Sequence, residues 1–134
     1  MLLNPGDHVE YDGDAIQYPD VKLIYWAGGN PFHHHQDLNR LVSAWRRPDT
    51  IIVNEPWWSP IAKWADIVFP ATTSLERQDI CASSHDNYAH FMERALKPHH
   101  ESKSDHEIFS LLASKLGFGA VSYTHLTLPT KRIV

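Results

Sequence analysis

Cysteine, long apolar runs and clustered basic residues are all scarce in this sequence of 134 residues. The single cysteine, Cys81, excludes an internal disulfide framework and every zinc pattern that is built from cysteines. No apolar run reaches the roughly 18 residues of a membrane-spanning helix, so we expect no membrane segment in the chain. The formal net charge is −4 and the basic residues are scattered, so nothing indicates a nucleic acid as partner.

The composition that remains is that of a globular chain. Hydrophobic residues make up 43% of the sequence, and there are five each of Trp, Tyr and Phe. A chain of this kind can bury enough apolar surface to offset the entropy lost on folding, which argues against disorder. Its length fits one small domain or a piece of a larger protein. The first residues lack the basic and apolar regions of a signal peptide, so none is expected.

Three short apolar runs predict strands, at residues 21–27, 50–55 and 66–71. Helices are predicted between and after them, at 38–45, where apolar residues recur at helical spacing, and at 59–65. Strands that alternate with helices need crossover connections, which favour a parallel sheet. The predicted fold class is therefore α/β, a Rossmann-like three-layer domain with a mostly parallel sheet.

Other segments are marked by local signals. Asp12 and Gly13 predict a hairpin turn near the start of the chain. Residues 72–103 read as a long polar loop with one strand near "YAHFMER". A helix is predicted over 104–117, because Ser104 and Glu107 form a capping box and Gly117 follows the last turn.

The stretch "LIYWAGGNPFHHHQDLNRL" raises the choice between a metal site and a phosphate-binding turn. Three consecutive histidines, residues 33–35, point in different directions in a helix or a strand, so they do not easily converge on one ion. A strand followed by Gly28, Gly29 and Asn30 and then a helix lets backbone N–H groups approach a phosphate closely. The spacing is not the usual G-x-G-x-x-G, so a simple tight turn stays an alternative.

Polar residues at the end of the second predicted strand could complete such a site. Asn54 and Glu55 stand where doubly wound sheets place groups that bind a ribose or a base, although Glu55 could equally cap a turn. Trp57 and Trp58 are interpreted either as a loop that covers the core or as a wall of a cofactor slot or domain interface. Arg77 could bind an anionic group or pair with neighbouring carboxylates.

Four segments resemble the molybdopterin oxidoreductases of the dimethyl sulfoxide reductase family, closest to the biotin sulfoxide, trimethylamine N-oxide and dimethyl sulfoxide reductases. They are "YWAGGNPFHHHQDLNRL", "TIIVNEPWW", "AKWADIVFPATTSLERQDI" and "SDHEIFSLLASKLG". The resemblance runs from roughly residue 3 to 117. It implies that residues 1–120 are a domain that binds molybdopterin guanine dinucleotide within a larger catalytic subunit. Residues 121–134 change in character, resemble translated cloning sequence and are left out of the functional interpretation.

The resemblance also implies a cofactor and residues that contact it. The cofactor is bis(molybdopterin guanine dinucleotide) molybdenum, and the Gly-rich turn would lie along the pyrophosphate of one dinucleotide. Asn54 and Glu55 would address the ribose or the guanine. The further contacts implied are His34, Gln36, Arg77 and Asp105. No catalytic residue or molybdenum ligand is assigned, because the serine that ligates molybdenum in these reductases lies in a segment upstream.

The family reaction is the two-electron reduction of an S-oxide or N-oxide, with transfer of the oxygen atom to molybdenum. The implied partners are the remaining domains of the subunit, a small oxide substrate and an electron-donor protein. A twin-arginine signal on the parent would place it in the periplasm, and its absence would place it in the cytoplasm. Two other hypotheses are a stand-alone nucleotide-binding α/β module without molybdenum and a metal-dependent hydrolase that uses the histidines.

Overall fold

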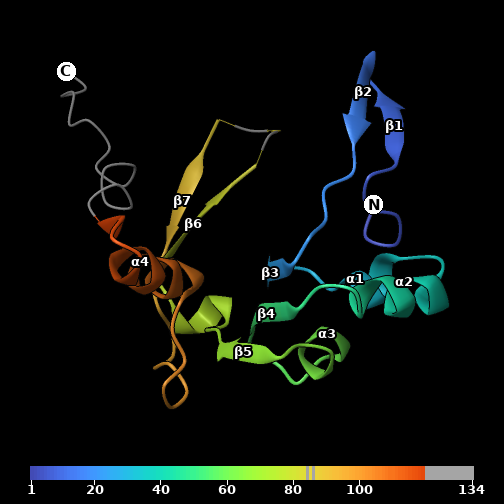
Figure 1. Ribbon diagram of the computed structural model, residues 1–134. Coiled ribbons are helices and arrows are strands. Elements are labelled where there is room, and N and C mark those ends of the chain that lie inside the picture. The colour runs from blue at the N-terminus through green and yellow to red at the C-terminus, as the bar shows by residue number, and fades with distance from the viewer. Residues whose placement is uncertain (84, 86, 120–134) are drawn as a thin grey trace. The chain divides into compact units, whose positions relative to one another are not determined.

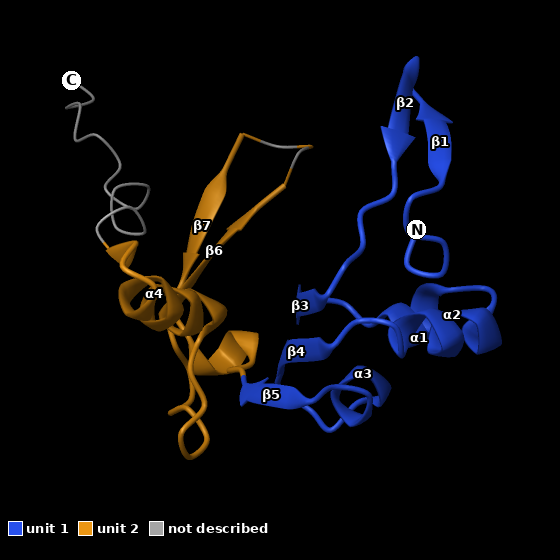
Figure 2. Cartoon of the chain, viewed as in Figure 1, with its two compact units in different colours: residues 1–70 blue, residues 71–134 orange. Residues whose placement is uncertain are grey.

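The computed structural model describes residues 1–83, 85 and 87–119 of the chain (Figure 1). The chain forms two compact units, and each is described here by itself (Figure 2). Unit 1 is Met1–Pro70, and unit 2 begins at Ala71. The tail predicted at residues 121–134 lies outside the described residues, so the domain boundary near residue 120 stays a prediction.

Unit 1 begins with an antiparallel hairpin of β1 (His8–Tyr11) and β2 (Asp14–Gln17). Asp12 and Gly13 form its two-residue loop with φ angles of 52° and 88°. Two consecutive positive φ angles are typical of the turn that best matches the twist of a hairpin. The predicted hairpin turn is confirmed.

The centre of unit 1 is a parallel sheet of three strands in the order β3-β4-β5. Strand β3 is Leu23–Ala27, β4 is Thr50–Glu55 and β5 is Ile67–Pro70. The central strand has a hydrogen-bonded neighbour on each side, and its residues Ile51, Val53 and Asn54 are buried. The predicted strands and the parallel sheet are confirmed, with ends that differ by one or two residues.

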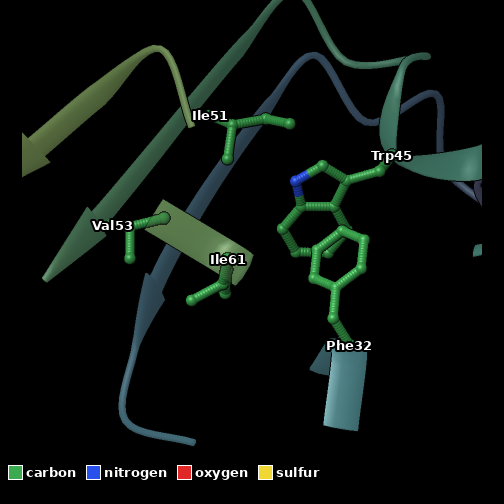
Figure 3. Packing of buried hydrophobic residues seen from close by; sticks show 5 residues of the cluster. All are labelled: Phe32, Trp45, Ile51, Val53 and Ile61. Carbon is green, nitrogen blue, oxygen red and sulfur yellow. The ribbon is translucent and has the colours of Figure 1, made fainter. Parts of the chain in front are cut away.

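Three helices supply the core of unit 1 on one face of this sheet. Helix α1 is Pro31–His34, α2 is Leu38–Trp45 and α3 is Pro60–Lys63. The core cluster joins side chains from all three helices and from β4 (Figure 3). Its members are Phe32, Trp45, Ile51, Val53 and Ile61. Burial of each such side chain contributes about 1.5–3 kcal/mol to the stability of the fold.

The opposite face of the sheet is not part of this core. Side chains alternate along a strand, so Tyr25, Ile52 and Phe69 lie opposite the face that carries Ile51 and Val53. Phe69 is an exposed residue on this face. Unit 1 is therefore a mixed α/β unit with a small parallel sheet and helices from one side, and the predicted third layer stays a prediction.

Helix α3 begins without a side-chain cap. Ser59 precedes Pro60 at the N-terminus of the helix, but its side chain makes no capping hydrogen bond. Its hydroxyl is buried without a hydrogen-bond partner among the described residues. Pro60 lacks an N–H and fits the first helical position without a cap, which explains why the helix still begins there.

Unit 2 contains a second antiparallel pair and one long helix. The 3-10 helix η1 is Ser74–Glu76, strand β6 is Asp79–Ala82, and β7 is Ala89–Met92. Strand β7 confirms the strand predicted near "YAHFMER". The predicted loop is wrong at β6, whose sequence, DICA, does not alternate between polar and apolar residues.

Helix α4 is Asp105–Lys115 and confirms the predicted helix over 104–117. The Ser104 hydroxyl accepts the Glu107 N–H at 3.2 Å, and the Glu107 carboxylate accepts the Ser104 N–H at 2.8 Å. Gly117 follows the helix with a φ angle of 83°. None of the helices in the described part of the chain is long and apolar enough to cross a membrane.

Candidate functional site

The Gly-rich turn lies directly after β3, at the carboxyl end of the parallel sheet. Gly28 and Gly29 have φ angles of 79° and 70°, which residues with a side chain rarely adopt. A Cβ atom at either glycine would meet no heavy atom within 4 Å. The glycines are therefore required by their backbone conformation, and the space beside the turn is open to a ligand.

Two side chains hold this turn from within unit 1. The indole Nε1 of Trp26 donates to the carbonyl oxygens of Gly28 and Gly29, at 2.8 Å and 3.2 Å. The Asn30 side chain accepts a hydrogen bond from the Phe32 N–H at 3.1 Å and caps α1. The side chain of Asn30 thus has a structural partner, and its backbone belongs to the turn.

Asn54 and Glu55 are the last two residues of β4, beside the turn. In the register of the sheet, Asn54 lies opposite Ala27, the residue before Gly28. Asn54 is only 4% exposed, and its Oδ1 accepts a hydrogen bond from the Tyr25 hydroxyl at 2.8 Å. Glu55 is half-buried at the strand end. The structure brings the predicted turn and these two residues to one edge of the sheet.

His34 and Gln36 lie in the connection between the Gly-rich turn and α2. His34 is the last residue of α1, and both side chains are exposed. Within the described part of the chain, no group of three or more His, Cys, Asp or Glu side chains could hold a metal ion. The three consecutive histidines therefore do not build a metal site with other described residues.

Arg77 and Asp105 belong to unit 2, where they line one cavity of about 980 Å³. The Nε of Arg77 lies 2.8 Å from the Asp79 Oδ2, and its Nη1 donates to the Thr72 carbonyl at 2.8 Å. The hydrogen bond from Arg77 holds the pKa of Asp79 below its usual value. Pairing with a neighbouring carboxylate is thus observed for Arg77, so part of its guanidinium is occupied within unit 2.

The wall of this cavity carries more carboxylates than arginines, and two of the carboxylates have structural roles. Hydrogen bonds from the Thr73 N–H and hydroxyl lower the pKa of Glu76. The corresponding bonds from Ser104, the backbone N–H first, lower the pKa of Glu107. An acidic wall repels a phosphate, so the cavity of unit 2 is a poorer candidate for a pyrophosphate than the turn of unit 1.

Trp57 and Trp58 follow β4 and are 67% and 69% exposed, so they do not cover the core.

Two aromatic residues of β3 support the site, although the sequence predicted them only as strand residues. The Tyr25 hydroxyl donates a hydrogen bond to Asn54, and the Trp26 indole N–H donates to the turn. Aromatic residues with a hydrogen-bond donor just before two glycines were the signal that could have identified them.

Comparison with known proteins identifies the family of the chain. A family model described as Molybdopterin oxidoreductase matches residues 3–115. The chain is 52% identical over 120 residues to a biotin sulfoxide reductase of Cereibacter sphaeroides, covering 90% of this chain and 16% of the relative. A dimethyl sulfoxide/trimethylamine N-oxide reductase of the same organism is 51% identical, with 90% and 15% covered. A trimethylamine-N-oxide reductase of Haemophilus influenzae is 49% identical, with 87% and 14% covered.

A solved structure with a similar fold is that of acetylene hydratase from Pelobacter acetylenicus. The TM-score is 0.66 at 19% sequence identity, and the match covers 77% of this chain and 14% of that one. This likeness supports the mixed α/β fold alone. The chain spans 14–16% of the length of the three reductases above. On the matched residues and these identities, the chain belongs to the molybdopterin oxidoreductases, in the family of the dimethyl sulfoxide, trimethylamine N-oxide and biotin sulfoxide reductases.

Proposed function

We propose that this chain is part of the catalytic subunit of a molybdenum-dependent reductase of S-oxides or N-oxides. In this proposal unit 1 binds one guanine dinucleotide of a bis(molybdopterin guanine dinucleotide) cofactor. The observation that carries it is the open Gly28-Gly29 turn beside Asn54 at the carboxyl edge of a parallel sheet. Ligands of open α/β sheets bind at this edge. The relatives' names supply the substrate class: biotin sulfoxide, dimethyl sulfoxide or trimethylamine N-oxide.

In this proposal, different residues of unit 1 bind different parts of the dinucleotide. Backbone N–H groups of the turn, from Gly28 to Asn30, would lie along the pyrophosphate, since such groups are strong donors to anionic oxygen. Asn54 and Glu55 would hold the ribose or the guanine, whose donors and acceptors match an amide and a carboxylate. His34 and Gln36 are exposed near the turn's far end and would add contacts.

Arg77 and Asp105 are proposed as additional contacts within unit 2. Both line the same cavity, which supports a shared role there. Arg77 already bonds Asp79 and the Thr72 carbonyl, so it would bind a ligand with the remainder of its guanidinium. The acidic wall favours a ligand group that donates hydrogen bonds.

When bound, the cofactor supplies the two-electron redox chemistry, and the protein supplies its binding and orientation. No residue of this chain is proposed as catalytic. The remaining domains of the subunit, an electron-donor protein and a small oxide are the proposed partners. The parent is proposed to work in the periplasm or the cytoplasm of a bacterium.

The exposed face of the sheet supports a part of a larger protein over a stand-alone module. A stand-alone α/β module without molybdenum requires a closed hydrophobic surface. Leu23, Ile67 and Phe69 are 53%, 44% and 37% exposed on the face of the sheet opposite the core. Apolar surface of this kind usually meets other parts of a protein.

The test is a comparison of two glycine variants in the parent protein. Gly29→Trp would fill the proposed pyrophosphate site. Gly13→Trp is the matched control, because Gly13 also has a positive φ angle and open space but lies in the hairpin. Molybdenum and acid-released guanine nucleotide are measured on the purified proteins. We expect the wild type and Gly13→Trp to hold both and Gly29→Trp to lose them, and equal contents in all three would refute the binding role.

A further inference from the structure

We infer that Trp26 is a positioning residue for the pyrophosphate. Its indole N–H fixes the two peptide planes of the turn so that the N–H groups of Gly29 and Asn30 face the ligand. The inference rests on the proposed nucleotide-binding role and adds a residue that does not itself touch the ligand.

The direction of the N–H groups follows from the direction of the carbonyls. The Trp26 Nε1 lies 2.8 Å from the Gly28 carbonyl oxygen and 3.2 Å from that of Gly29. In a planar trans peptide, the C=O and the N–H that follows it point in opposite directions. The N–H groups of Gly29 and Asn30 therefore point away from the indole.

Two successive N–H groups on one side of a turn form a concave site that attracts anions. The carbonyl oxygens, which would repel a phosphate, are turned toward Trp26. Indole is a donor only, so it suits two carbonyl oxygens and cannot be replaced by an acceptor. A Cβ atom at either glycine would meet no heavy atom within 4 Å, so no part of the described chain fills the space at these two Cα atoms.

The indole is itself held by the core of unit 1. The ring of Trp26 packs edge-to-face against that of Trp45, with centroids 5.6 Å apart. Trp45 in turn contacts the ring of Phe32 at 5.5 Å. Phe32 donates its N–H to Asn30, so the start and the end of the turn are both tied to the same aromatic cluster.

Such anchoring matters because the turn contains two glycines. Glycine has more backbone freedom than any other residue, and a free turn would lose that freedom on binding. A turn already held in its binding conformation loses less, which strengthens binding. Loss of the Trp26 hydrogen bonds should therefore raise the dissociation constant of the chain for a phosphate.

The test uses two variants of the full 134-residue chain that each remove a donor from an aromatic side chain. Trp26→Phe keeps an aromatic ring but removes the donor to the turn. Tyr11→Phe is the control, since Tyr11 is 70% exposed in the hairpin and lies outside the aromatic cluster that holds Trp26. Inorganic pyrophosphate and guanosine diphosphate are titrated into ¹⁵N-labelled protein, and the amide signals of Gly29 and Asn30 are followed by NMR.

We expect saturable shifts of both amide signals in the wild type and in Tyr11→Phe. In Trp26→Phe the dissociation constant should rise at least about tenfold, while unfolding in urea remains a single cooperative transition. Binding by Trp26→Phe within twofold of the wild type would overturn the positioning role and leave the nucleotide site in place. A wild type that binds neither probe at millimolar concentration would overturn both.

A measurement on the wild type covers the case in which Trp26→Phe does not fold. The indole N–H of Trp26 should exchange with solvent more slowly than those of Trp57 and Trp58, which are exposed. An exchange rate equal to theirs would show that the hydrogen bonds to the turn do not form, and would overturn the inference.

Discussion

The hydroxyl of Tyr25 donates a hydrogen bond to the Oδ1 of Asn54 at 2.8 Å, across the two strands β3 and β4. Because the hydroxyl donates its proton, the atom that accepts it must be the amide oxygen rather than the amide nitrogen. The bond thus sets the orientation of a buried amide at the carboxyl edge of the sheet, where the nucleotide is proposed to bind.

Replacement of Tyr25 by Phe should destabilise the chain by about 1 kcal/mol, the typical worth of one hydrogen bond. Urea unfolding of the 134-residue chain measures the loss. Tyr11→Phe is the control, because Tyr11 is 70% exposed and its hydroxyl is free to meet water. Equal stability of the two variants would show that the Tyr25 bond contributes nothing.

Replacement of Gly29 by Ala should cost about 1–2 kcal/mol, because the φ angle of 70° is unfavourable for a residue with a Cβ. Open space at this position means that no steric contact adds to the loss. Gly29→Asn should cost less, since Asn adopts positive φ angles more readily. Chemical denaturation of the three proteins gives the comparison, and an Ala variant as stable as the wild type would contradict the described turn.

Replacement of Ile61 by Ala should cost about 2–5 kcal/mol, since its side chain is fully buried in the core of unit 1. A loss of this size is comparable with the whole stability of a small domain. Ile16→Ala provides the contrast within unit 1, because Ile16 is 44% exposed in the hairpin. Thermal unfolding followed by circular dichroism should separate the two variants clearly, and similar melting temperatures would argue against the core described here.

The capping box of α4 should make its helix sensitive to acid. Hydrogen bonds from Ser104 lower the pKa of Glu107 in the folded chain. The stabilisation is complete above the unfolded pKa of about 4.3, and it is lost as the pH falls through the lowered folded pKa. Far-UV circular dichroism from pH 7 to pH 3 records this loss.

Glu107→Gln should keep the capping geometry, since Gln can accept the same bonds, and should lose the acid response that comes from this residue. Glu101→Gln is the control, an exposed carboxylate outside the helix and its cap. It should retain the acid response of the wild type. If the Glu107 and Glu101 variants respond alike, the cap does not contribute to the pH dependence.

Elements whose characteristic residues lie close together in the sequence could be predicted from it. The capping box at Ser104 and Glu107 and the loop at Asp12 and Gly13 each lie within four residues of chain. The three parallel strands were predicted because each of them contains its own run of apolar residues. Strand β6 was missed because its four residues show no clear alternation of polar and apolar side chains.

The sequence predicted the main residues of the candidate site but not the hydrogen bonds that hold them in place. The turn at Gly28 and Gly29 and the residue Asn54 were predicted, and the register of the sheet brings them to one edge. The bonds of Tyr25 and Trp26 depend on strand register and on turn geometry, which no spacing in the sequence reveals. Whether the predicted residues bind a nucleotide stays a prediction.

The order of the parallel sheet has a consequence for how the chain is synthesised. Strands β3, β4 and β5 are neighbours in space in the same order in which they leave the ribosome. When β4 and β5 are synthesised, the strand with which each of them pairs is already present. None of these three strands therefore has to insert between two others. The crossovers run over residues 28–49 and 56–66, so each strand pairs with the strand that directly precedes it in the sequence. Unit 1 can therefore assemble its sheet vectorially, with the Gly-rich turn in place as soon as β4 pairs with β3.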